Sequence, residues 1–128
     1  RVLFRSVTVP AHPALFSAHD EELGHLRRYR SAALRAVLDR NGLRPALFFS
    51  FYGSLLGPRA AAVALERSGL HRPAPGAVAR WPFAESDPRT RAIKSALDAD
   101  FALNRRLAER GLSLPGLSLC ALCRHDIA

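Results

Sequence analysis

The stretch LRPALFFSFY, residues 43–52, indicates the fold more directly than any other part of the chain. In an extended conformation it would be apolar on both faces, which is typical of an inner strand of a sheet. Residues 116–125, GLSLCALCRH, have the same character and predict a second such strand. A shorter β-branched run, Val7–Val9, stops at Pro10 and predicts the carboxyl end of a third buried strand.

Helical signals lie between these strands. A helix is expected from Ser31, which is a favourable N-cap, to Gly42, which favours a helix end. A second is expected after Ser54, again as the cap, and it would end at Gly69. Residues 10–30 between the first strand and the first helix are expected to form a loop with one helical turn.

Proline and glycine predict a long loop over residues 70–88, which carries Trp81 and Phe83. A helix over residues 88–110 follows it, because Asp87-Pro88 has the favoured order of a cap and then proline. Strands that alternate with helices favour an α/β fold. A sheet of only three strands has too many open edges for a comfortable domain, so we expect the chain to be part of a larger one.

The charge of the chain does not indicate a nucleic-acid partner. A net charge of +8 would attract nucleic acid or anionic lipid if the basic residues were grouped. They are scattered instead, with no run longer than Arg27-Arg28 or Arg105-Arg106, so we attribute the charge to solubility. Two cysteines without a signal-peptide pattern are typical of a reducing, cytoplasmic setting.

The first six residues, RVLFRS, resemble the end of a sequencing adapter translated in one frame, and the sequence contains no Met. We therefore expect residues 1–6 to be non-native and the native chain to span residues 7–128. A genuine strand over Val2–Val9 is the alternative interpretation, because that run is apolar enough.

Chemistry is concentrated in HDEELGHLRRYR, residues 19–30, directly after a predicted strand end. Ligands of open α/β sheets bind beyond the carboxyl ends of the strands, so this stretch is a candidate site. His19 or His25 would supply a proton acceptor and Asp20 would orient it. The alternative is an ordinary acidic first turn of a helix, matched by basic residues one turn later.

A metal site is the competing hypothesis, since a metal hydrolase built on the two histidines would need zinc. His19 and His25 lack the H-E-x-x-H spacing that puts two imidazoles on one helix face, so no metal is expected. The spacing of CALC, residues 120–123, also fits zinc, but the run has no second pair of cysteines. Three residues apart on a strand, the two thiols would point to opposite faces, and we expect buried, unreactive cysteines.

Residues 7 to about 65 resemble the region after the fifth strand of class I S-adenosylmethionine-dependent methyltransferases. The resemblance rests on Val9-Pro10-Ala11, Ser17, His19-Asp20 and Gly24-His25-Leu26-Arg27-Arg28-Tyr29, and it is strongest to bacterial members related to the small-molecule and ubiquinone-type O-methyltransferases. Residues 111–125 resemble the last strand of that family. Residues 70–100 match only as a variable helical insertion.

The resemblance implies a Rossmann-like, seven-stranded sheet whose seventh strand is antiparallel and lies between the fifth and the sixth. This chain would then be the C-terminal, substrate-side half, with the last three strands and a helical insertion. The glycine-rich loop and the acidic residue that hold S-adenosylmethionine belong to the family's first two strands and are not in this sequence. S-adenosylmethionine is therefore expected as a cofactor of the full-length protein only, and this part alone would be inactive.

For the site, the resemblance implies that His19 or His25 acts as the base, oriented by Asp20. Phe16, Arg28 and Tyr29 would shape the pocket of a small-molecule methyl acceptor. The apolar residues 48–56 would suit a lipophilic acceptor or a peripheral membrane contact, although core packing explains them as well.

One alternative from another class remains open, namely a small basic helical interaction module without enzymatic activity. Such a module would unfold cooperatively by itself, and its binding would weaken steeply with salt.

Overall fold

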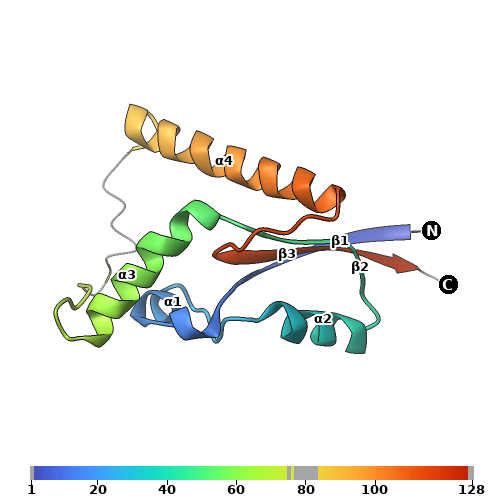
Figure 1. Ribbon diagram of the computed structural model, residues 1–128, viewed down its shortest axis with the longest axis horizontal. Helices are drawn as coiled ribbons and strands as arrows, with labels where there is room; N and C mark the ends of the chain where they lie inside the picture. Colours follow the sequence, from blue (N-terminus) through green and yellow to red (C-terminus); the bar gives the residue numbers. More distant parts are fainter. Residues whose placement is uncertain (1, 75, 77–83, 127–128) are drawn as a thin grey trace.

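The computed structural model describes residues 2–74, 76 and 84–126, and it has the mixed α/β architecture expected from the sequence (Figure 1). The strands are β1 (Val2–Pro10), β2 (Arg44–Phe51) and β3 (Ser118–Asp126). The α-helices are α1 (Ala18–Glu22), α2 (Ser31–Arg40), α3 (Leu56–Arg67) and α4 (Pro88–Glu109), and two short 3-10 helices are η1 (Pro13–Leu15) and η2 (Gly53–Leu55). Trp81 and Phe83 of the predicted long loop lie outside the described residues.

The three strands form one sheet in the order β1-β3-β2. β3 is antiparallel to both neighbours, so β1 and β2 run parallel to each other and are connected through α2. The register pairs Pro10 and Phe51 with the same residue, Ser118, from opposite sides. The carboxyl ends of β1 and β2 therefore lie at the same end of the sheet, where α1 and α3 are found (Figure 1).

Helices cover both faces of this sheet (Figure 1). On one face, Leu34 and Leu38 of α2 pack against Leu119, Ala121 and Cys123 of β3. Because successive side chains of a strand point to opposite faces, the intervening Cys120 of β3 belongs to the second core cluster, on the side of α4. The apolar character of β3 on both faces thus follows from its central position between two helical layers.

The prediction that residues 43–52 form an inner strand is wrong for the sheet as described, since β2 lies at an edge. Its two faces are nevertheless both covered. Phe48 packs against the cluster beneath α2, whereas Phe49 and Phe51 contact the ring of Phe101 on α4, with centroid distances of 5.3 and 5.0 Å. Burial by helices, rather than by strands on both sides, accounts for the pattern.

The predicted helix over residues 88–110 is confirmed as α4. Asp87 caps it, because its carboxylate accepts a hydrogen bond of 2.7 Å from the amide of Arg89, and Pro88 is the first helical residue. Asn104 is the buried residue of α4, and its Nδ2 donates to the main-chain and side-chain oxygens of Asp100.

β1 spans Val2–Pro10, which agrees with the alternative interpretation of a strand over Val2–Val9, and β3 pairs with it along its whole length. Two predicted boundaries are corrected. Ser31 is the first residue of α2, and Arg30 occupies the cap position. Ser54 does not cap the third helix, which begins at Leu56, because its hydroxyl donates instead to Asp100 of α4 over 3.2 Å.

Gly116 fixes where the chain enters β3. A Cβ atom at this position would lie 2.3 Å from the carbonyl oxygen of Phe51, so only glycine allows the backbones to approach this closely. The two cysteines behind it, Cys120 and Cys123, are buried and unpaired as expected, and burial raises the pKa of both thiols. Within the described ranges, no helix is long and apolar enough to span a membrane.

Candidate functional site

The loop that follows β1 returns to the point where it started. The amide of Tyr29 donates to the carbonyl of Pro10 over 2.9 Å, and Tyr29 forms an isolated parallel bridge with Ala11. Residues 12–28 are therefore an excursion from the carboxyl end of β1, and the predicted site residues lie within it, except Tyr29, at which it ends.

Asp20 is the centre of this excursion. Its side chain is fully buried although it carries a carboxylate, and each of its oxygens has several partners. Arg28 binds it side-on, with Nε 2.9 Å from Oδ2 and Nη2 2.9 Å from Oδ1. The amide of Ser17 donates to Oδ2 over 3.1 Å and completes a capping box at the start of α1.

Arg28 uses its remaining terminal nitrogen within the fold as well. Its Nη1 donates to the carbonyl of Ala11 over 2.9 Å, and the side chain is only 4% exposed. Arg28 therefore ties Asp20 to the end of β1. The predicted role of Arg28 in shaping the pocket of a methyl acceptor remains a prediction. In the structure, its guanidinium binds Asp20 and the carbonyl of Ala11.

Arg59 joins the cluster from α3, which sequence reasoning did not anticipate. Its Nη2 donates to the hydroxyl of Ser17 and lies 3.3 Å from Oδ2 of Asp20. The Nε atom of Arg59 is buried and has no hydrogen-bond partner among the described residues. No local signal could have revealed this contact, because 39 residues separate Arg59 from Asp20.

Burial alone would raise the pKa of the Asp20 carboxyl, but the hydrogen bonds from Arg28 and His25 outweigh it and hold that pKa below its usual range. Asp20 is therefore ionised near neutral pH and can only accept hydrogen bonds. His25 lies beside it, with Nδ1 3.3 Å from Oδ1. Since the acceptor is a carboxylate, Nδ1 carries the hydrogen, and Nε2 of the neutral ring is left as a proton acceptor.

His19 is in a different electrostatic situation. Partial burial and then the positive charge of Arg59 lower the pKa of its imidazole. No hydrogen bond from the His19 ring to a described residue accompanies this shift. The structure thus brings His25, and not His19, into contact with the orienting carboxylate that the sequence predicted.

The two predicted aromatic residues lie outside the Asp20 cluster. Phe16 is half-buried at the end of η1. Tyr29 packs against the core beneath α2, and the guanidinium of Arg27 lies over its ring at 4.3 Å from the centroid. Tyr29 also lines two cavities.

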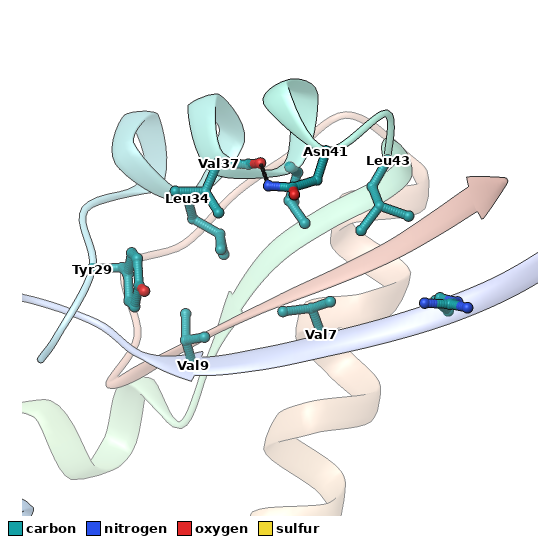
Figure 2. A pocket seen from close by; sticks show the side chains of 9 residues that line it. Val7, Val9, Tyr29, Leu34, Val37, Asn41 and Leu43 are labelled. Carbon is teal, nitrogen blue, oxygen red and sulfur yellow. Dashed lines mark hydrogen bonds between the residues drawn. The ribbon is translucent and has the colours of Figure 1, made fainter. Parts of the chain in front are cut away.

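The first cavity, of about 450 Å³, lies between β1 and α2 (Figure 2). Figure 2 shows Val7 and Val9 on β1 facing Leu34 and Leu43 across it, with Tyr29 at one end. Arg5 and Asn41 are the other polar residues in its wall, so it is largely apolar.

The second cavity, of about 400 Å³, lies at the carboxyl ends of β1 and β2. His12 lines it and is a residue that sequence reasoning missed. Its backbone has φ 60°, in the left-handed region that is rare for residues with side chains, and its Nε2 is 3.0 Å from the carbonyl oxygen of Gly116. The available signal was its position between two prolines, Pro10 and Pro13, directly after a strand.

The sequence matches no family model, no curated protein and no solved structure. Within the described part of the chain, no three His, Cys, Asp or Glu side chains gather closely enough to hold a metal ion.

Proposed function

We propose that this chain is the C-terminal, substrate-side part of a class I S-adenosylmethionine-dependent methyltransferase that O-methylates a small molecule in the cytoplasm. The remainder of such an enzyme would supply the cofactor site. The chain itself would contribute the end of the sheet and the loop over the acceptor.

The observation that carries the proposal is the order and direction of the strands. The resemblance implies that the last strand is antiparallel and lies between the two strands that precede it. β3 has this relation to β1 and β2, and α2 makes the crossover between the two parallel strands. The loop with His25 and Asp20 follows the carboxyl end of β1, which is where ligands bind in open α/β sheets.

The open side of β1 also supports the proposal. No strand within residues 2–74, 76 and 84–126 pairs with its second edge. The apolar cavity beside Val7 and Val9 lies along the same strand. A strand with an unpaired edge beside an apolar cavity suits an interior position in a wider sheet.

The described residues do not fit S-adenosylmethionine. The turn after β1 contains a single glycine, Gly24, so it offers no glycine-rich cradle for the cofactor. The buried carboxylate of that turn, Asp20, is already paired with Arg28 and Arg59 and cannot hold a ribose. We therefore assign no cofactor contact to these residues.

In the proposed reaction, this chain would supply the general base that deprotonates the methyl acceptor. Nε2 of His25 would accept the proton of the acceptor hydroxyl, while Nδ1 donates to Asp20 and keeps the ring in the required tautomer. Because the Asp20 carboxylate is also held by two guanidinium groups, its position is fixed before an acceptor binds.

Methyl transfer to a panel of small hydroxyl compounds, by a longer polypeptide that includes this chain, tests the proposal. His25→Ala should lower turnover by about 10²- to 10⁴-fold, as expected for the loss of a general base. His71→Ala, a change at an exposed histidine outside the loop, is the matched control and should leave turnover unchanged.

Full turnover by both His25→Ala and His19→Ala would remove the proposed base. S-adenosylmethionine binding by the 128-residue chain alone would contradict the proposal that the cofactor site lies in the remainder of the enzyme. If the chain alone unfolds cooperatively and binds polyanions with a steep salt dependence, the interaction module is the better explanation.

A further inference from the structure

The cavity at the carboxyl ends of β1 and β2 has the properties of a small-molecule site. Its volume of about 400 Å³ lies within the range of ligand pockets. Its floor is apolar, with Ala11 at the end of β1 and Leu119 at the start of β3, both at most 3% exposed. Pro13 and Ala14 of η1 form a further apolar wall.

The polar groups of this cavity come from three separate segments. His12 precedes η1, Arg30 and Ser31 lie at the start of α2, and Ser50 belongs to β2. Segments that are far apart in the sequence thus direct hydrogen-bonding groups to one space, as ligand sites require.

The residues that line the cavity carry charge of one sign only, which is positive. Arg30 is a cation, and no aspartate or glutamate is among the lining residues. The Arg30 guanidinium forms no ion pair with any described residue, in contrast to those of Arg28 and Arg59 around Asp20. A ligand with an acidic group would therefore meet an available cation and no repelling carboxylate.

One wall is fixed before any ligand enters. Since a carbonyl oxygen only accepts, Nε2 of His12 must carry the hydrogen that it donates to Gly116 over 3.0 Å. The backbone of Gly116 in turn lies so close to that of Phe51 that a Cβ atom would not fit between them. The imidazole is consequently held in one orientation and one tautomer, which limits the ordering cost of binding.

We propose that this cavity binds a small organic acid, with its carboxylate at Arg30 and its apolar body against Ala11, Pro13 and Leu119. The occupancy of the site does not depend on methyl transfer, so it can be tested separately from the proposed function.

The test is a titration of the ¹⁵N-labelled chain with sodium benzoate, followed by NMR at constant ionic strength. Benzamide has the same shape without the charge and is the matched control ligand. Saturable shifts are expected at the amides of Ala11, Ala14 and Ser31 with benzoate, and the affinity for benzamide should be weaker by about 2- to 5-fold, the effect of one exposed ion pair.

Three variants make the result specific. Arg30→Gln should weaken benzoate binding by about 2- to 5-fold, which is the effect of losing one exposed ion pair. Arg40→Gln, at the other end of α2 and outside the cavity wall, should leave the affinity unchanged. Ser50→Leu fills the cavity from β2 and should abolish saturable binding.

Equal binding of benzamide and benzoate would overturn the proposal, as would an unchanged affinity in Arg30→Gln. Shifts spread over the arginines of the surface, or none at millimolar benzoate in a folded chain, would overturn it as well.

Discussion

The segments that follow the carboxyl ends of β1 and β2 are both held in place by an aspartate, but the partners of the two aspartates differ. Each strand is followed by a residue in the left-handed conformation, His12 or Tyr52, and then by a 3-10 helix. An aspartate then holds the following segment. Asp20 does so within the loop after β1, whereas Asp100 reaches the turn after β2 from α4.

The partners of the two aspartates differ in charge. Asp20 is fully buried and is bound by two guanidinium groups. Asp100 is partly exposed, and its donors among the described residues are all neutral, namely the amide of Tyr52 at 2.7 Å, the amide and hydroxyl of Ser54, and Nδ2 of Asn104. The comparison indicates that the first turn depends on ionisation and the second mainly on hydrogen bonding.

The largest effect is expected from Asp20→Ala. It leaves Arg28 buried without its counter-charge, which typically costs about 3–5 kcal/mol of folding free energy. Urea unfolding measures the loss, and Asp39→Ala, an exposed aspartate on α2, is the control that should show no change. A loss below about 1 kcal/mol would mean that the buried cluster adds little to stability.

A smaller effect is expected from Asp100→Ala. The hydrogen bonds to Tyr52 and Ser54 are lost, but these groups can reach water, so about 1–2 kcal/mol should be lost. Asp98→Ala, an exposed position on the same helix, serves as the control in thermal unfolding. A cost equal to that of Asp20→Ala would invalidate the distinction drawn between the two turns.

The smallest effect on the free energy of unfolding is expected from mild acidification. Because the folded-state pKa of Asp20 is lowered, its contribution to stability is present above the unfolded-state pKa and is lost as the pH falls through the folded-state pKa. Unfolding free energies of the wild type and Asp20→Asn, measured over a series of pH values, should converge only below the usual range of an aspartate pKa. Convergence at a higher pH would contradict the lowered pKa.

Local signals were sufficient for much of the fold. The Asp87-Pro88 pair identified the start of α4, and the apolar runs identified β2 and β3. The signal failed at Ser54, whose local pattern is that of a cap, because Asp100 on another helix engages its hydroxyl. The sequence left the start of β1 open between two interpretations of residues 1–6, because pairing with β3 sets it.

The candidate site, like the fold, was predictable from the sequence only where its contacts are local. The spacing of Asp20, His25 and Arg28 within one loop made their association foreseeable. Arg59 and the contact of His12 with Gly116 were not, because both depend on how distant segments pack. The stretch therefore indicated that a cluster would form but not which groups would be left available for a ligand.

The pairing of Val2 with Asp126 has a practical consequence for work with this protein. Val2 and Asp126 thus lie side by side at the end of the sheet opposite to α1 and α3 (Figure 1). An affinity tag or a fluorescent fusion at either terminus would therefore be attached near the end of the sheet that is farther from the Asp20 cluster. Labels at both termini would also be close enough to report, by energy transfer, when β1 separates from β3.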